Sequence, residues 1–239
     1  MKAMILAAGL GTRLKPLTDR FPKALLEVGG KPLLAHAIEN LVQHGFDEII
    51  VNVHHFASQV ISYLNQFPTE NFSIQISDES DQLLDTGGAI VHARGFLTSD
   101  FLLYNVDIIT DIDLKAFFEF HQKESAMATL AVSNRQTSRL LVFNEENRLC
   151  GRIVKDSSSS YPDVKPGQYH RAFSGIHAIS PLIFNKQYPS GAFSIIQYYL
   201  HYCDNEKIIA WDHTGAHWFD VGKPETLNQA DDFIRNRHH

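Results

Sequence analysis

The sequence predicts an α/β protein with a mixed, mostly parallel sheet and helices on both faces. Up to about residue 105, short apolar stretches alternate with segments whose apolar residues recur every three or four positions. This alternation is typical of βαβ units, in which helices cover a parallel sheet. A chain of 239 residues can bury one substantial core, and no internal repeat is visible. We therefore expect a single domain over residues 1–239.

The first half of the chain supplies four predicted strands and three predicted helices. The apolar run at residues 3–7 indicates a buried strand that ends in small residues and glycines. A helix is expected over residues 31–42, because apolar positions three and four apart follow Pro32 and the pattern stops near Gly45. In chain order, the other elements are a strand at 48–53, a helix at 57–67, a strand at 72–77, a helix at 86–97 and a strand at 101–105.

The pattern changes beyond residue 125. The expected elements are strands at 128–133, 139–143, 171–179 and 208–212, and helices at 194–202 and 224–234. Four consecutive serines at 157–160 and two nearby prolines indicate an excursion between strands, and whether residues 156–168 form a lid stays open.

Several polar segments follow predicted strands of the first half. They are residues 9–13, the pair His54-His55, and residues 105–107. Ligands of parallel α/β sheets bind at the carboxyl ends of the strands, so these segments predict one shared cleft. Adjacent strand residues point to opposite faces, so we interpret the two histidines as supporting or capping groups rather than a metal pair.

A glycine-rich loop follows the first strand, as Leu6-Ala7-Ala8-Gly9-Leu10-Gly11-Thr12-Arg13. Glycines let backbone N–H groups face a phosphate, although a tight strand-to-helix turn has the same composition. Residues 1–31 hold six Lys/Arg and two Asp/Glu, whereas the remaining chain carries 15 and 25. A basic, glycine-lined corner on an acidic protein indicates a polyphosphate site. The loop has neither the Gly-Lys-Ser/Thr of a P-loop nor the third glycine of the dinucleotide fingerprint.

The loop and two later segments resemble the signature of the sugar-1-phosphate nucleotidyltransferases. The loop continues as Leu14-Lys15-Pro16-Leu17-Thr18, and Pro22-Lys23-Ala24-Leu25 and Gly30-Lys31-Pro32-Leu33 follow in the family's order and spacing. The resemblance implies the Rossmann-like nucleotide-diphospho-sugar transferase fold, with a nucleotide-binding half at about 1–110 and a sugar-binding half at about 111–239. It also implies transfer of a nucleotidyl group from a nucleoside triphosphate to a sugar 1-phosphate, with release of pyrophosphate.

The same resemblance implies roles for individual residues. Arg13 is expected on the β- and γ-phosphates, and Lys23 between the α-phosphate and the sugar phosphate. Nucleotide contacts are expected from Ala8, Gly9, Gly11, Thr12, Gln82, Thr86, Gly87 and Gly88, and sugar contacts from Asn105, Ser174 and Gly175. A glycine such as Gly175 can alternatively mark a β-bulge, and Asp85 or Thr86 can simply cap a helix.

Two aspartates far apart in the chain are the candidate metal ligands. Asp107 follows the strand at 101–105, and Asp220 lies in a late Trp-x-Asp-x-Gly-x-Pro segment that starts at Trp218. Mg²⁺ takes only one or two protein carboxylates together with waters and phosphate oxygens. An aspartate at a strand end is more often a turn former, but the family holds its Mg²⁺ with aspartates at these two places. The family usually has glycine where this chain has Val106.

The substrate expectation comes from Leu84-Asp85-Thr86-Gly87-Gly88. This form is most similar to bacterial N-acetylmuramate-1-phosphate uridylyltransferases, which act in cell-wall recycling, whereas related guanylyl enzymes usually show Gly-Thr-Ala-Gly. Our first hypothesis is therefore UTP with N-acetylmuramate 1-phosphate. A mannose- or heptose-1-phosphate guanylyltransferase is the second, and a non-catalytic nucleotide-sugar-binding regulatory protein is the third.

Composition excludes several other classes. A net charge of −6 and a pI near 6.1 argue against a nucleic-acid binder. Cys150 and Cys203 form no disulfide framework, and no apolar stretch reaches 18 residues. We expect a cytoplasmic protein without nucleic-acid or membrane partners, as a monomer or homodimer. Whether His238-His239 are native is left open.

Overall fold

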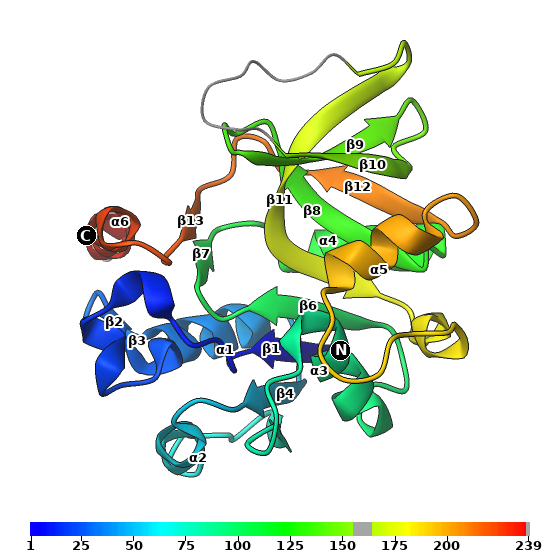
Figure 1. Ribbon diagram of the computed structural model, residues 1–239. Coiled ribbons are helices and arrows are strands. Elements are labelled where there is room, and N and C mark those ends of the chain that lie inside the picture. Colours follow the sequence, from blue (N-terminus) through cyan, green and yellow to red (C-terminus); the bar gives the residue numbers. More distant parts are fainter. Residues whose placement is uncertain (155–163, 238–239) are drawn as a thin grey trace.

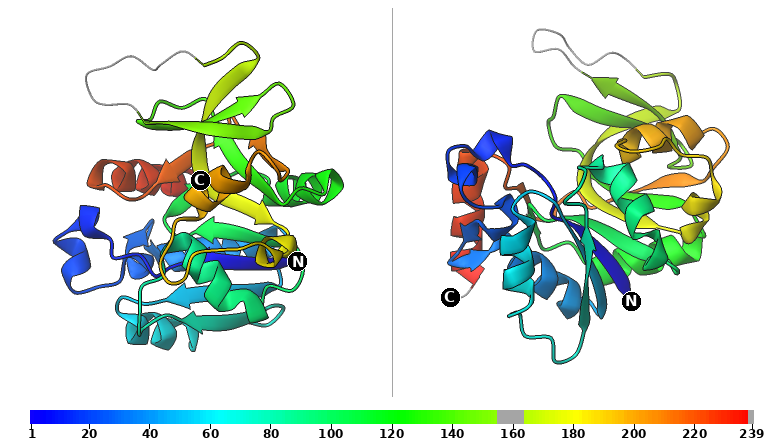
Figure 2. Two further views of the ribbon diagram at one scale, coloured as in Figure 1. Left: turned by 45° about the vertical axis from the view of Figure 1, so that its right-hand side comes forward. Right: turned by 60° about the horizontal axis from the view of Figure 1, so that its bottom comes forward.

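The computed structural model describes residues 1–154 and 164–237. Within these residues, nine strands form one mixed sheet in the order β10-β9-β11-β6-β1-β4-β5, and β8 joins it by pairing with β11 and β12 (Figure 1). Helices cover both faces of this sheet (Figure 2). The predicted fold class is confirmed.

The four strands predicted in the first half form the parallel part of the sheet. They are β1 (Lys2–Leu6), β4 (Glu48–Val53), β5 (Ser73–Asp78) and β6 (Phe101–Asn105). Their side chains alternate between two apolar layers: Ala3 and Ile5 enter one cluster, and Met4 enters the other. The central strands β1 and β6, which are buried on both faces, are almost continuously apolar in sequence, whereas the edge strand β5 alternates apolar and polar residues.

Each apolar layer is completed by helices. One layer contains buried residues of α1 (Leu33–Gln43), α2 (Ala57–Leu64) and α4 (Leu114–Glu124). The other contains residues of α3 (Asp85–His92) and α5 (Ile195–Tyr202). The sheet therefore lies between two layers of helices. The polar residues at the carboxyl ends of its parallel strands are not covered by these layers, and a ligand can bind there.

The second half of the chain extends the same sheet. The strands are β8 (Ala128–Ser133), β9 (Arg139–Asn144), β10 (Leu149–Val154), β11 (Gln168–Ile179) and β12 (Ile208–Asp212). β11 pairs antiparallel with β6 through its last four residues and with β9 through its first four. One long strand thus connects the two halves of the chain.

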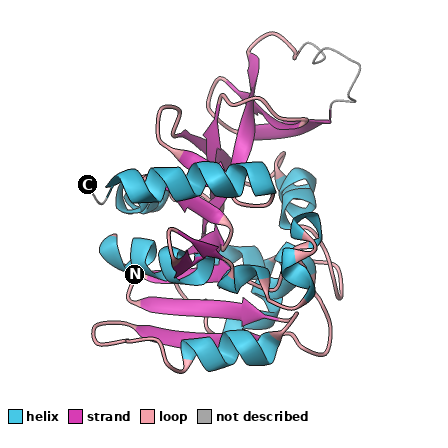
Figure 3. Cartoon of the chain, turned by 90° about the vertical axis from the view of Figure 1, so that its left-hand side faces the viewer, coloured by secondary structure: helices cyan, strands magenta, loops and turns pink. Residues whose placement is uncertain are grey.

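Two small sheets bring the C-terminus back to the N-terminal half. β7 (Ile108–Thr110) pairs with β13 (Trp218–Asp220), and β2 (Glu27–Val28) pairs with β3 (Lys31–Pro32). The long α6 (Pro224–Arg237) leads to the C-terminal end of the described chain (Figure 3). It packs beside β2 and the glycine turn after it, and the backbone N–H of Gly29 donates to Asp231 at 2.5 Å.

The structure corrects several predicted elements. The helix predicted over 31–42 begins at Leu33, because Lys31 and Pro32 are extended and pair with β2. The helix predicted to 67 ends at Leu64, and the one predicted to 97 ends at His92 and continues as a 3₁₀ turn. The sequence reasoning missed β7, β10, β13 and α4, although Asp113 caps α4 by accepting the N–H of Ala116 at 2.9 Å. Most of the serine- and proline-containing excursion falls at residues 155–163, outside the described residues.

Candidate active site

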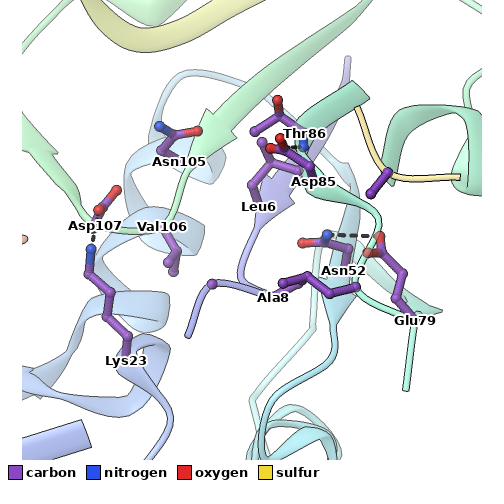
Figure 4. Close-up of a pocket in the computed structure, with 13 residues that line it drawn as sticks. Leu6, Ala8, Lys23, Asn52, Glu79, Asp85, Thr86, Asn105, Val106 and Asp107 are labelled. Carbon is purple, nitrogen blue, oxygen red and sulfur yellow. Dashed lines mark hydrogen bonds and ion pairs between the residues drawn. The ribbon is translucent and has the colours of Figure 1, made fainter. Parts of the chain in front are cut away.

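A cavity of about 400 Å³ opens at the carboxyl ends of β1, β4, β5 and β6 (Figure 4). Its walls are Leu6, Ala8, Gly9, Lys23, Asn52, Glu79, Leu83, Asp85, Thr86, Asn105, Val106, Asp107 and Ala192. The glycine loop and residues 105–107 therefore share one cleft, as predicted. The third predicted segment, His54-His55, does not line this cavity, and Nδ1 of His54 is hydrogen-bonded to the Glu79 carbonyl at 2.7 Å.

The glycine-rich loop folds back on itself at Gly11. This residue has φ +63°, and a Cβ there would lie 2.7 Å from Cγ2 of Thr18. Thr18 also donates to the Gly11 carbonyl at 2.8 Å. By contrast, the space beside Gly9 is open to 4 Å. The loop is thus stiff at Gly11 and accessible at Gly9, where a phosphate can approach the backbone.

Lys23 and Asp107 form an ion pair at one end of the cavity. Lys23 lies on a 3₁₀ turn (Lys23–Leu25) and is 8% exposed, and its Nζ contacts Oδ2 of Asp107. The Asp107 carbonyl accepts the N–H of Val221 at 2.8 Å, which ties this strand end to β13. The pair fixes a cation in the cavity wall (Figure 4), and the open Gly9 lines the same cavity.

Arg13 and Asp220 form a second cation–carboxylate contact. Arg13 Nη2 lies 3.9 Å from Asp220 Oδ1, and both side chains are partly exposed. Gly222 makes this approach possible, since a Cβ there would lie 2.5 Å from Arg13 Nη2 and 2.7 Å from Asp220 Oδ1. Arg13 and Asp220 do not line this cavity, but Asp220 lies close enough to Asp107 to interact with its charge.

The two predicted metal ligands fit a hard divalent cation. Burial and the negative charge of Asp107 raise the pKa of Asp220, and Oδ1 of Asp220 is buried without a hydrogen-bond partner. A cation between the carboxylates would relieve both effects. No group of three or more His, Cys, Asp or Glu residues suited to a metal occurs in the described part of the chain. Two carboxylates alone suit Mg²⁺, which completes its coordination with waters and phosphate oxygens.

The Thr86-Gly87-Gly88 segment opens α3 and packs closely against the loop before α5. A Cβ at Gly87 would overlap the ring of Phe193, and one at Gly88 would lie 2.6 Å from the Gly191 carbonyl. The N–H of Gly87 donates to the Phe193 carbonyl at 2.8 Å. The absence of side chains at the two glycines therefore lets this loop pack against α3. The space beside the glycines is filled by the loop and is not available to a nucleotide base. Thr86 does line the cavity, with its hydroxyl accepting the N–H of Ile195 at 3.0 Å, so it does not cap its own helix.

The remaining predicted nucleotide residues are spread around the cleft. Ala8 lines the cavity, and Thr12 begins the 3₁₀ turn that carries Arg13. Gln82 is exposed and lies outside the cavity wall, and its backbone N–H donates to the Glu79 carbonyl at 3.0 Å.

The predicted sugar-contacting residues meet where β11 crosses β6. Gly175 has φ +75°, and a Cβ there would lie 2.8 Å from Nδ2 of Asn105. The β8–β11 register shifts between Phe173 and His177, so Gly175 also lies in a bulge. Asn105 lines the cavity. Ser174 is fully buried, and its hydroxyl is hydrogen-bonded to Nε2 of His213 at 2.7 Å.

Sequence reasoning missed a buried polar pair, Asn52 and Glu79, in the cavity wall. Asn52 Oδ1 accepts the N–H of Ala7 at 2.7 Å, and Asn52 Nδ2 donates to Glu79 Oε1 at 2.9 Å. Glu79 is 3% exposed, and burial raises its pKa. One signal was available: Asn52 interrupts the apolar strand Glu48–Val53. A polar residue at such a position needs a buried partner.

Comparison with known proteins supports an assignment based on this geometry. Residues 2–142 match the family described as Nucleotidyl transferase. The chain is 33% identical over 232 residues to the N-acetylmuramate alpha-1-phosphate uridylyltransferase of Neisseria meningitidis serogroup B, covering 96% of each chain. It is 30% identical over 234 residues to the mannose-1-phosphate guanyltransferase of Aspergillus oryzae, and this match covers 94% of the chain but 62% of that longer relative.

A solved structure shares the fold over nearly its whole length. HddC from Yersinia pseudotuberculosis, complexed with GMP-PN, has a TM-score of 0.79 and 25% identity, with 98% of this chain and 99% of that chain covered. No helix within the described residues is both long and apolar enough to span a membrane. The match over more than half of the chain, together with the full-length uridylyltransferase relative, places the protein in the nucleotidyl transferase family, as an enzyme of the sugar-1-phosphate nucleotidyltransferase type.

Proposed function

We propose that this enzyme transfers a uridylyl group from UTP to N-acetylmuramate 1-phosphate in an Mg²⁺-dependent reaction that releases pyrophosphate. The observation that carries the reaction type is the pairing of Lys23 with Asp107 in the wall of the cavity that the open backbone at Gly9 also lines. A fixed cation, a carboxylate and a phosphate-accessible loop thus face the same cavity.

The residues at this end of the cavity would bring the α-phosphate of the nucleotide and the phosphate of the sugar together. The sugar phosphate oxygen attacks the α-phosphorus in line, a new P–O bond forms, and the bond to the β-phosphate oxygen breaks. Lys23 would contact both the α-phosphate and the sugar phosphate, which otherwise repel one another. Because Lys23 is 8% exposed, its charge is only weakly screened by water.

Arg13 and the two aspartates would bind the pyrophosphate and the metal ion, respectively. Arg13 is exposed and positioned over Gly222, so its guanidinium would bind the departing pyrophosphate. Asp107 and Asp220 would hold Mg²⁺, which neutralises charge on the α-phosphate and the sugar phosphate. Asp107 would then touch both the metal and Lys23, which orients the ammonium toward the reacting phosphates.

The sugar would lie against Asn105 and the backbone of Gly175. Asn105 offers a donor and an acceptor at the cavity wall, and the missing side chain at Gly175 gives the Asn105 amide room beside β11. Ser174 would support the strand and not contact the sugar, because its side chain is fully buried and its hydroxyl is hydrogen-bonded to His213. The uridylyltransferase relative, which this chain matches over 96% of the relative's length, supports N-acetylmuramate as the sugar and UTP as the nucleotide, as does the Leu84-Asp85-Thr86-Gly87-Gly88 segment.

A guanylyltransferase is the second candidate. It is supported by the guanine nucleotide in the HddC complex and by the fungal mannose-1-phosphate guanyltransferase, of which this chain spans 62%. A GTP-dependent reaction would use the same phosphate end of the cavity.

Mg²⁺-dependent pyrophosphate release tests these proposals directly. Five nucleotides (UTP, GTP, CTP, ATP and dTTP) are each paired with N-acetylmuramate, N-acetylglucosamine, mannose, heptose and glucose 1-phosphates. We expect UTP with N-acetylmuramate 1-phosphate to react fastest. A preference for GTP would instead establish the guanylyltransferase. Pyrophosphate release from no pair, with nucleotide-sugar binding retained, would contradict both proposals and indicate a regulatory protein.

A further inference from the structure

Arg135 is a cation that its neighbours hold in a fixed position near the proposed sugar site. It lies in the segment between β8 and β9, and its guanidinium carbon is 4.0 Å from the centroid of the Trp218 ring. Its Nη2 donates to the Phe173 carbonyl of β11. Trp218 in turn donates from Nε1 to the Ser174 carbonyl at 2.8 Å. Ring stacking and these hydrogen bonds therefore fix the guanidinium against β11, two residues before Gly175.

The charge of Arg135 lacks a direct partner. No carboxylate forms an ion pair with it within the described residues, and its Nε is buried there without a hydrogen-bond acceptor. Asp220 acts on the charge of Arg135 at longer range, but Asp220 forms its own ion pair with Arg13 and is a proposed metal ligand. A partly buried guanidinium without a counter-ion is destabilising. Arg135 is therefore suited to an anion that arrives with a ligand.

Arg135 also lines a small cavity of about 80 Å³. Arg171, Asn134 and Gln136 belong to its wall, and no acidic residue lines it in the described part of the chain. Arg171 is paired at 2.8 Å with Asp212, which lies outside this wall. Cavities that hold whole small molecules are several times larger. The small cavity therefore suits a single anionic substituent of a ligand.

N-acetylmuramate 1-phosphate carries two anionic groups, the phosphate and the carboxylate of the lactyl ether at O3. In the described residues that line the larger cavity, Lys23 is the one basic side chain, whereas Glu79, Asp85 and Asp107 are acidic. With Lys23 engaged by phosphates, a further anion would be repelled by these three carboxylates. The lactyl carboxylate therefore needs a cation outside this wall.

Arg135 lies within reach of a substituent on a sugar that is held at Gly175. The carbonyl that accepts from Arg135 belongs to Phe173, two residues before Gly175 in the same strand. Two residues of strand span roughly 7 Å, which is about the length of a lactyl group together with a hydrogen bond. The sugar ring can thus stay beside Gly175 while its carboxylate meets the guanidinium.

We propose that Arg135 binds the lactyl carboxylate of N-acetylmuramate 1-phosphate and thereby selects this sugar over N-acetylglucosamine 1-phosphate, which lacks the lactyl group. The inference rests on the proposed function, because it takes N-acetylmuramate 1-phosphate as the substrate. The contact is a charge-assisted hydrogen bond between a planar guanidinium and a planar carboxylate, and this geometry favours arginine over lysine.

The variant Arg135→Gln separates recognition of the carboxylate from a structural role. The two sugar phosphates differ only in the lactyl group, so the ratio of their kcat/KM values with UTP measures that recognition. We expect kcat/KM for N-acetylmuramate 1-phosphate to fall roughly 10- to 100-fold, and that for N-acetylglucosamine 1-phosphate to change by less than about threefold. Arg135→Lys keeps the charge and should retain part of the preference. Arg94→Gln is the matched control, because Arg94 is exposed and donates to Tyr188.

A second measurement uses the wild-type enzyme, in case Arg135→Gln does not fold or N-acetylglucosamine 1-phosphate reacts too slowly. Methyl esterification of the lactyl carboxylate removes its charge and adds only one methyl group. We expect the wild-type enzyme to prefer the free acid over the methyl ester by roughly 10- to 100-fold in kcat/KM. Arg94→Gln should show the same preference.

The possible failures are distinguishable. Equal losses for the two sugars in Arg135→Gln would mean that Arg135 serves the shared phosphate or the fold, which would overturn its role at the carboxylate and leave the proposed function standing. Equal use of the acid and its methyl ester by the wild-type enzyme would do the same. A wild-type enzyme that does not use N-acetylmuramate 1-phosphate would overturn the proposed function and the carboxylate contact together.

Discussion

Lys23 and Asp107, which are 84 residues apart in the chain, form an ion pair at the carboxyl end of β6. Lys23 reaches it from a short 3₁₀ turn, and Asp107 is anchored to β13 through its backbone carbonyl. The pair thus joins the turn at Lys23 to the end of β6 in the cavity wall, and it leads to the first prediction.

Lys23→Ala should lower kcat roughly 100- to 1,000-fold, because it removes a preorganised cation from the point where negative charge accumulates. Initial-rate measurements of pyrophosphate release test this. Lys115→Ala is the matched control, since Lys115 is exposed on α4 and pairs only with Glu119 among the ion pairs of the described residues. A Lys23→Ala enzyme with nearly normal kcat would contradict the role we propose for this lysine.

Asp220→Asn should raise the Mg²⁺ concentration needed for half-maximal rate by roughly tenfold or more, because an amide oxygen is a weaker ligand than a carboxylate. The same change removes a partly buried negative charge next to Asp107, so the free energy of unfolding without metal should not fall. A Mg²⁺ titration of the rate and a urea denaturation in EDTA measure the two effects. An unchanged Mg²⁺ dependence would exclude Asp220 as a ligand.

Gly175→Ala should destabilise the fold by about 1–2 kcal/mol, because residue 175 has φ +75°. Its new Cβ would also press against Nδ2 of Asn105, so KM for the sugar 1-phosphate should rise more than KM for the nucleotide. Gly151→Ala in β10 is the control: its Cβ would make an ordinary 3.8 Å contact with Val142. Equal increases in the two KM values would argue against a sugar contact at this crossing.

Two buried histidines predict how stability depends on pH. Burial lowers the pKa of His177 to about 3 and that of His121 to about 4, so both are neutral in the folded state. In the unfolded chain their pKa is about 6.5, and below this value the unfolded state binds more protons. Their contribution to stability is therefore fully present above pH 6.5 and is lost as the pH falls toward 4 and 3.

The size of this effect can be measured by urea denaturation at pH 7.5 and 5.5. Each histidine should lower the free energy of unfolding by about 1.4 kcal/mol per pH unit below its unfolded pKa. His177→Gln should remove part of this slope, whereas His201→Gln, on the exposed side of α5, should leave it unchanged. The same slope in the wild type and in His177→Gln would show that His177 does not titrate on unfolding.

The sequence by itself determined the parallel half of the fold and the phosphate end of the site. The run at residues 3–6 in β1 is continuously apolar because both faces of the strand are buried, so its pattern is visible without any partner. The glycine loop, Lys23 and residues 105–107 follow strands of this half directly, and parallel strands bring their carboxyl ends to one edge. These features could be predicted because each depends on residues that are close together in the sequence.

Only the tertiary structure decided the contacts between distant segments. Gly87 and Gly88 are glycines because the loop at Gly191 and Phe193 packs on them, and Gly175 is a glycine because the amide of Asn105 lies beside it. The orientation of Glu79 depends on Asn52, which depends in turn on the backbone N–H of Ala7, 45 residues away from Asn52. Such choices involve partners that no local window contains, because hydrogen-bond direction and close packing are properties of the folded neighbourhood.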